Sequence, residues 1–245
     1  MTPSTIVLIP IYQPLLSVLE QFSLDHSLPL LAGRDVRFIG PRGLDYGYYQ
    51  LRYPGIPFEA FDPAYFASIA GYNQLMLSPA FYERYAAHEF MLVLQTDAIL
   101  LRDDLDPFCG PHAKTVRALV GNGGLSLRRI RKCQALLREF PQALDMFRRT
   151  GSSEDLYFAI MGLLSADFVL PNEREAARFS WELQPEHYHA IDCRPPMGGH
   201  AWWKYSPNFW ARFFRMPPPL QATTVPARLT EPGPLAESAA PATPA

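Results

Sequence analysis

The chain has 245 residues, a length typical of one domain or at most two. Its formal net charge of −2 argues against a protein drawn to nucleic acid by overall charge, and no apolar run is long enough for a membrane-spanning helix. The N-terminus lacks the basic and apolar regions of a signal peptide, and three widely spaced cysteines indicate reduced thiols, so a cytoplasmic protein is expected.

The first part of the chain predicts strands alternating with a helix. Continuous apolar residues over 5–11 indicate a buried strand, and 35–40 is typical of a second one. Between them, apolar residues at helical spacing over 15–24 indicate a helix. Residues 41–65 are rich in Tyr, Gly and Pro and predict a loop with short extended pieces. This order is typical of an α/β fold with a mainly parallel sheet flanked by helices.

Two more helices are predicted before the most informative stretch. One covers 64–77, and the other starts at Ser78, a good N-cap followed by Pro79, and runs to about residue 87. The apolar run that begins at Phe90 then leads directly into Gln95, Thr96 and Asp97, as expected for a central strand buried on both faces.

Asp97 is therefore expected at the edge of the sheet where α/β proteins bind ligands. A carboxylate there can hold a hard cation, and the cation can hold a diphosphate. The alternative is that Gln95 and Asp97 only cap the end of the strand.

A glycine-rich segment follows over 120–125. Gly121, Gly123 and Gly124 allow the backbone to approach a ligand closely, and Ser126 is expected to cap a helix that runs to about residue 140. The basic residues 128–132 fall largely off the apolar stripe of that helix, so they form either a solvated face or a contact for a phosphate or an anionic acceptor.

The last third of the chain predicts a helix, a strand and a tail. Glu154 and Asp155 open the helix, where carboxylates stabilise the helix dipole, and 166–170 is expected to be a late strand. His200 lies beside glycines and either serves a site or closes a loop. Residues 217–245 are dominated by Pro, Ala, Thr and Glu and are expected to be a disordered tail.

The order of these motifs resembles the DUF5672 family of glycosyltransferase-like proteins over roughly residues 3–215. The segments that carry the resemblance are 10–12, 72–73, 95–97, 121–126, 154–155, 179–182 and 199–202. More distantly, the set is similar to nucleotide-sugar glycosyltransferases of the GT-A fold. The resemblance implies that residues 1–216 form a single GT-A-like glycosyltransferase domain, whose mainly parallel sheet is flanked by helices.

The resemblance also implies a role for particular residues. Asp97 matches the second carboxylate of an Asp-x-Asp metal motif, and His200 matches a late metal ligand. Gln95 stands where the first Asp of that motif is expected, and its neutral oxygen could bond a ribose hydroxyl. The residues implied for the nucleotide sugar are Pro10, Tyr12, Asn73, Gln95 and Asp97, and those implied for the acceptor and donor pocket are Asn122, Gly123, Gly124 and Trp202. Asp155, or else Glu154, matches the catalytic base.

The implied function is transfer of a sugar from a nucleoside-diphosphate sugar to a glycan or lipid-linked acceptor. Transfer with inversion needs a carboxylate to take the proton of the acceptor hydroxyl, and Mn²⁺ or Mg²⁺ commonly neutralises the leaving diphosphate. A retaining mechanism stays open. The expected partners are the donor and the acceptor but no nucleic acid, and the basic residues 128–132 could hold the protein weakly at an anionic membrane.

Two other functions compete with transfer. A sugar nucleotidyltransferase of similar fold is less favoured, because the turn after the first strand lacks a glycine-rich basic loop. A catalytically inactive protein that binds a carbohydrate or nucleotide is favoured by Gln95 in place of a carboxylate.

Overall fold

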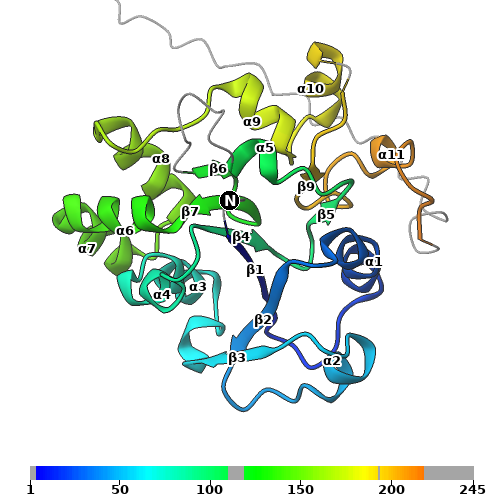
Figure 1. Ribbon diagram of the computed structural model, residues 1–245, viewed down its shortest axis with the longest axis horizontal. Helices are drawn as coiled ribbons and strands as arrows, with labels where there is room; N and C mark the ends of the chain where they lie inside the picture. Colours follow the sequence, from blue (N-terminus) through cyan, green and yellow to red (C-terminus); the bar gives the residue numbers. More distant parts are fainter. Residues whose placement is uncertain (1–3, 110–118, 193, 218–245) are drawn as a thin grey trace, which may run out of the picture.

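The computed structural model describes residues 4–109, 119–192 and 194–217 (Figure 1). Except for Pro217, the predicted tail lies outside the described residues. The strands are β1 Thr5–Pro10, β2 Asp35–Pro41, β3 Phe58–Phe61, β4 Phe90–Leu94, β5 Ile99–Leu100, β6 Leu119–Gly121, β7 Leu125–Arg129, β8 Ser180–Trp181 and β9 Gly198–Gly199. The helices are α1 Val18–Ser27, α2 Gly47–Arg52, α3 Ile69–Met76, α4 Pro79–Arg84, α5 Asp106–Cys109, α6 Ile130–Glu139, α7 Pro141–Thr150, α8 Glu154–Leu164, α9 Glu173–Phe179, α10 Pro185–Asp192 and α11 Pro207–Trp210, with 3₁₀ turns at Leu28–Leu31 and Pro63–Tyr65.

The main sheet of the described residues has the strand order β3-β2-β1-β4-β7-β6. The first four strands are parallel, and β7 and β6 are antiparallel to their neighbours. The predicted α/β fold with a mainly parallel sheet is confirmed. Because β1 and β4 are adjacent and parallel, Pro10, which ends β1, and Asp97, which follows β4, lie at the same edge of the sheet.

Alternating residues of β1 explain why the sheet is covered on both faces. Ile6 and Leu8 belong to a core shared with α3, α4, α6, α7 and α8, whereas Val7 and Ile9 belong to a core shared with α1, α2, α5 and α9. Figure 1 shows α3, α4, α6, α7 and α8 gathered on one side of the strands and α1 and α2 on the other. Every residue of β1 is buried, which is why the strand is a continuous apolar run. Within the described ranges, no helix is both long and apolar enough to cross a membrane.

The strand predicted over 166–170 is wrong, because this segment is irregular. Its apolar pattern has another cause: Phe168 is 4% exposed and stacks on Phe158 of α8. A Cβ on Gly162 would lie 2.7 Å from the Phe168 ring, so this glycine makes room for the ring. The segment fills a gap in the helical layer instead of extending the sheet.

The prediction for the glycine-rich segment also needs correction. Gly121 ends β6 and Leu125 begins β7, so the segment is the turn of an antiparallel hairpin. Ser126 lies within β7 and caps no helix, since α6 begins at Ile130. Gly121 has φ of 100°, and a Cβ there would lie 2.0 Å from the Leu125 carbonyl oxygen, so the tight turn requires glycine.

Residues 41–65, predicted as loop with short extended pieces, contain such a piece as β3 and also the helix α2. The helix was missed because its Gly and Tyr residues have low helix propensity and it is stabilised by burial of Tyr49. In the predicted 64–77 helix, only Ile69–Met76 is α-helical.

A second, smaller sheet of order β5-β9-β8 lies beside the end of β4. Trp181, Trp202 and Trp210 form a buried aromatic cluster beneath it. A Cβ on Gly199 would lie 2.1 Å from the Trp210 ring, so the ring packs directly against the backbone of β9. This packing fixes the strand that leads into His200.

Candidate functional site

The candidate site lies at the carboxyl edge of β1 and β4. Pro10 is the buried last residue of β1, and Tyr12, two residues later, is 53% exposed. Burial raises the pKa of the Tyr12 phenol, the nearby charges of Glu20 and Asp97 raise it further, and Lys204 opposes them. Tyr12 therefore lies within electrostatic range of Asp97 although the two are far apart in sequence, because their strands, β1 and β4, are adjacent.

The turn of the β6–β7 hairpin is attached to the same edge. The Asn122 Oδ1 atom accepts hydrogen bonds from the backbone N–H groups of Gly124 at 3.1 Å and Leu125 at 2.9 Å, which organises the turn. The Gln95 N–H donates to the Gly124 carbonyl oxygen at 2.8 Å. The glycine turn and the end of β4 are thus held together by backbone.

His200 packs against this turn. A Cβ on Gly124 would lie 2.1 Å from the imidazole ring, so only glycine leaves room for His200 here. The His200 N–H donates to the Trp181 carbonyl oxygen at 2.9 Å, which anchors the residue to β8. The His200 Nε2 atom lies 3.2 Å from Asp97 Oδ1, so the two residues that the resemblance implies as metal ligands are neighbours.

Two further charged residues complete a network around His200 and Asp97. The His200 Nδ1 atom lies 3.3 Å from Glu182 Oε1, and Glu182 Oε2 accepts a hydrogen bond from Asn122 Nδ2 at 2.7 Å. The Lys204 Nζ atom donates to Asp97 Oδ2 at 2.6 Å. We call Asn122, Glu182, His200, Asp97 and Lys204 the strand-end network.

The charges of the network shift the two central groups in opposite directions. Burial favours neutral Asp97, but His200 and Lys204 outweigh it and lower the pKa of Asp97 to about 2. Burial likewise favours neutral His200, but Asp97 and Glu182 outweigh it and raise the pKa of His200 to about 9. Without a ligand, the network therefore holds an ionised carboxylate between two cations at neutral pH.

Lys204 and Glu182 were not among the predicted site residues. Ala201 adopts a left-handed φ of 49°, and the turn that follows, closed by the Lys204 N–H on the Ala201 carbonyl oxygen, brings Lys204 back onto Asp97. Glu182 lies in the 179–182 segment that carried the family resemblance, which was the one sequence signal for it. No local pattern marks Lys204, because its partner lies 107 residues away.

Glu154 and Asp155 are adjacent in sequence but lie in different environments. The Glu154 carboxylate accepts two hydrogen bonds of 2.8 Å from Arg128, whose guanidinium also donates to Tyr82 and Ser126. Burial raises the pKa of the Glu154 carboxyl, and Arg128 offsets part of that rise. Since both side chains are enclosed, Glu154 is a structural partner of Arg128 and is not free to act as a base. The expectation that Glu154 could be the catalytic base is corrected accordingly.

Asp155 is exposed on the first turn of α8. A Cβ on Gly123 would lie 3.7 Å from Asp155 Oδ2, so this carboxylate faces the glycine turn. Glu154 Oε1 lies closer still to that Cβ, at 3.2 Å, but its side chain is buried, so Asp155 has the access to solvent that Glu154 lacks.

Two more predicted residues are structural. Trp202 is fully buried, and its indole N–H donates to Ser23 Oγ at 2.8 Å, so it has no surface with which to line a pocket. Asn73 is 7% exposed; its amide donates to the Gly151 carbonyl oxygen at 3.4 Å and accepts from the Glu154 N–H at 3.5 Å. Asn73 therefore joins α3 to the start of α8, and its assignment to the nucleotide sugar is not supported.

Two residues of the strand-end network, Asp97 and His200, carry donor atoms of the kind that bind divalent cations. Both ring nitrogens of His200 are buried without a well-aligned hydrogen bond, so Nε2 has a lone pair available to a metal when the ring is neutral. Nδ1 faces Glu182, the arrangement that orients metal-binding histidines. Across the described ranges, no group of three or more His, Cys, Asp or Glu side chains is arranged to hold a metal, so Asp97 and His200 would need ligand oxygens to complete the coordination.

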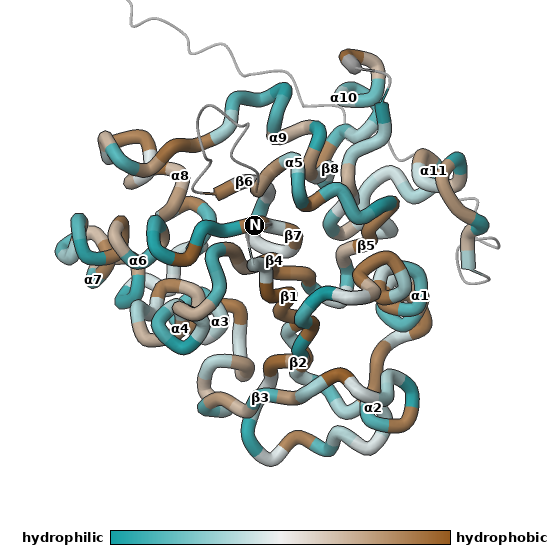
Figure 2. Tube along the Cα trace, in the orientation of Figure 1, coloured by the Kyte–Doolittle hydropathy of each residue, from teal (hydrophilic) through white to brown (hydrophobic). Residues whose placement is uncertain are grey.

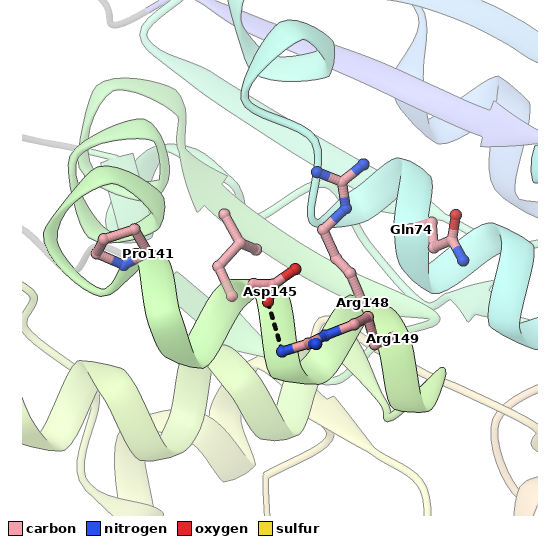
Figure 3. Close-up of a pocket in the computed structure, with 6 residues that line it drawn as sticks. Gln74, Pro141, Asp145, Arg148 and Arg149 are labelled. Atoms are coloured by element: carbon pink, nitrogen blue, oxygen red, sulfur yellow. Dashed lines mark ion pairs between the residues drawn. The ribbon is translucent and has the colours of Figure 1, made fainter.

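A hollow of about 530 Å³ lies away from this network, between α3 and α7 (Figure 3). Its lining consists of Gln74, Pro141, Leu144, Asp145, Arg148 and Arg149. Arg149 pairs with Asp145 at 2.6 Å, whereas Arg148 extends toward α3. The side chains of that pair are mostly exposed, so the hollow is an open polar surface and not an enclosed active site.

Comparisons with known proteins agree with the architecture. A family model described as "Protein of unknown function (DUF5672)" matches residues 55–200. No curated protein matches the sequence.

Solved glycosyltransferases share the fold at low identity. The galactosyltransferase LgtC, in complex with donor and acceptor sugar analogues, is 15% identical, with a TM-score of 0.50 over 80% of this chain and 86% of that one. An active-site mutant of LgtC is 13% identical, with a TM-score of 0.52 over the same shares. A glycosyltransferase involved in glycosylation of the major capsid of PBCV-1 is 8% identical, with a TM-score of 0.50 over 81% of this chain and 92% of that one. The chain therefore has a GT-A-like fold.

Proposed function

Because the chain belongs to the DUF5672 family of proteins of unknown function and has the fold of glycosyltransferases, we propose that it transfers a sugar from a nucleoside-diphosphate sugar to an acceptor hydroxyl. The observation that carries the proposal is the strand-end network, because Asp97, His200 and Lys204 meet at the ligand-binding edge of the sheet.

The charge of the network suits a diphosphate leaving group. Lys204 is 52% exposed, and its ammonium could exchange Asp97 for a phosphate oxygen by a change of rotamer. When bound by Asp97 and His200, Mn²⁺ or Mg²⁺ would supply further neutralisation of the diphosphate. Glu182, which accepts a hydrogen bond from Asn122, would keep the His200 ring in position from the side opposite Asp97.

Asp155 is our candidate for the general base. Its carboxylate is exposed on the first turn of α8, where it can accept the proton of an acceptor hydroxyl. Gly123 leaves the space beside it open. A base in this role corresponds to inversion at the anomeric carbon, and we assign the acceptor side of the site to Asn122, Gly123, Gly124 and Asp155. Tyr12 and Gln95, on the strand ends, remain our candidates for contacts to the nucleotide sugar.

A binding protein without catalysis is the second candidate. The observation that favours it is Gln95 at the place of the first carboxylate of the metal motif, which leaves fewer anionic ligands for a cation.

Calorimetric titration of the full chain with UDP- and GDP-sugars, with and without Mn²⁺, tests the proposal. We expect binding that strengthens with metal, and we expect Asp97→Asn to abolish that strengthening. Asp104→Asn is the matched control, because Asp104 pairs with Arg102 in the loop after β5 and lies outside the network.

The same titration separates the two candidates when donor hydrolysis is measured in parallel. Binding with hydrolysis supports transfer, whereas binding without hydrolysis or transfer to any sugar acceptor supports the inactive binding protein. Absence of binding to every nucleotide sugar would contradict both.

A further inference from the structure

Helix α8 is apolar on both of its faces. Its inner face, which includes Tyr157, Phe158 and Met161, is buried in the core shared with α6 and α7. Its outer face consists of Leu156, Ala159, Ile160, Leu163 and Leu164, all of them exposed. Leu163 is 78% exposed and Leu164 is 67% exposed, and no described residue covers them.

A surface helix normally places charged residues on its outer face. In α8 the only charged residues are Glu154 and Asp155, at the first turn, and Glu154 is buried. In Figure 2 the hydrophobic turns of α8 lie at the edge of the molecule. A contiguous exposed apolar face of this kind marks an interaction site.

The neighbouring helices indicate the chemistry of the partner. Together α6 and α7 carry five basic residues against two acidic ones, in a chain of net charge −2. The contact of Phe147 with Tyr157 at 5.4 Å places α7 beside α8. Arg148 is exposed and forms no ion pair with another described residue, so its charge is available to an anion (Figure 3).

The basic residues predicted to face a membrane do not all do so. Arg128 is buried against Glu154, and Arg129 pairs with Glu89 at 2.7 Å. On α6 and α7, Arg138 lies 4.0 Å from Glu83 and Arg149 pairs with Asp145 at 2.6 Å, so the available positive charge there is mainly that of Arg131, Lys132 and Arg148.

We propose that the outer face of α8, flanked by the basic residues of α6 and α7, docks onto an anionic lipid membrane. Leucine side chains enter the acyl boundary and arginines meet the headgroup phosphates, which is how amphipathic helices bind membrane surfaces. The charge complementarity favours this partner over a second copy of the chain, whose own α6 and α7 would bring like charges together.

Docking there has a consequence for the acceptor, and this part rests on the proposed function. Asp155 and Leu164 lie at opposite ends of α8, roughly 14 Å apart at about 1.5 Å per residue. A membrane in contact with the leucines would hold a lipid-linked acceptor with its sugar headgroup within reach of Asp155. The acceptor class is therefore a saccharide or alcohol attached to a lipid.

Flotation of the full chain with vesicles tests the docking surface directly. We expect wild type to bind vesicles of equal parts phosphatidylcholine and phosphatidylglycerol, and to bind pure phosphatidylcholine more weakly. Leu163→Ser combined with Leu164→Ser should weaken binding at least about tenfold, since each leucine loses most of its apolar transfer energy. Arg148→Gln combined with Arg149→Gln should weaken only the binding that depends on phosphatidylglycerol.

Leu51→Ser is the matched control, because Leu51 is 86% exposed on α2, on the other side of the sheet from α8 (Figure 1). Equal loss in this variant, or no binding by wild type to either vesicle, would overturn the proposal. So would a dimer in sedimentation that the α8 double variant dissociates, since a second copy would then cover the face.

Donor hydrolysis in solution keeps this test separate from the proposed function. The double variant Leu163→Ser/Leu164→Ser and the control Leu51→Ser should both hydrolyse the donor at the wild-type rate, because their changes lie away from the strand-end network. Vesicle binding without nucleotide binding would support the docking surface and contradict the proposed glycosyltransferase function. Donor hydrolysis without vesicle binding would support the proposed function and contradict the docking surface.

Discussion

The Arg128–Glu154 pair and the strand-end network are two groups of charges on either side of the glycine turn. In the pair, both side chains are almost fully enclosed, at 1% and 3% exposure, and the carboxylate receives two aligned hydrogen bonds. In the network, Lys204 is half exposed, and the ring nitrogens of His200 lie near carboxylates without aligned hydrogen bonds.

The difference separates a structural ion pair from a group of charges able to accept a ligand. A buried pair with its hydrogen bonds complete loses stability when either partner is removed, and it has nothing left to offer a substrate. Charges that are partly exposed and incompletely bonded can change partners at small cost. Glu154 and Asp155 are next to each other in sequence, yet they belong to the two different classes.

The largest effect is expected at Asp155. Asp155→Asn keeps the size of the side chain but cannot accept a proton, so sugar transfer should fall by roughly 10²–10⁴-fold. Nucleotide binding by calorimetry should be unchanged, because Asp155 lies across the turn from the strand-end network. Turnover within about tenfold of wild type would show that Asp155 only stabilises the helix dipole.

Breaking the buried pair should have the largest effect on stability. Glu154→Gln leaves Arg128 without a charged partner, which costs about 3–5 kcal/mol and lowers the melting temperature by on the order of 10 °C. Replacing both residues, with Arg128→Met and Glu154→Leu, should recover much of the loss. If Glu154→Gln instead abolished transfer with unchanged melting, the pair would belong to the reaction.

A smaller effect on binding is expected at Glu182. Glu182→Gln keeps a hydrogen-bonding group for Asn122 but removes the charge that faces His200 Nδ1, so metal-dependent nucleotide binding should weaken about 10–100-fold. Calorimetry with Mn²⁺ measures this, and Glu186→Gln on α10 is the control. Affinity unchanged by Glu182→Gln would remove Glu182 from the positioning of His200.

The smallest effect should come from an exposed pair. Asp145→Asn removes the Arg149 partner on α7, where both side chains are more than half exposed, and should cost only about 0.3–0.5 kcal/mol in chemical denaturation. A loss as large as that of Glu154→Gln would mean that exposure does not distinguish the two groups of charges.

Local patterns were sufficient for the elements that are buried on both faces or capped by neighbours in sequence. The apolar runs of β1 and β4 predicted two buried strands, because a strand covered on both sides has no polar face. Ser78 and Pro79 predicted the start of α4 for an equally local reason. The same reasoning wrongly predicted a strand over 166–170, since an apolar segment such as the one around Phe168 can fill a gap between helices without pairing as a strand.

By itself, the sequence determined the central strands, the position of Asp97 after one of them, and the resemblance that joined Asp97 to His200. Only the tertiary structure decided which carboxylate of 154–155 is enclosed, that Trp202 is core, and that Lys204 and Glu182 complete the network. The reason is physical: period and capping depend on residues a few positions apart, whereas burial and ion pairing depend on contacts between elements such as β4 and the turn after β9, which the chain brings together only when it folds.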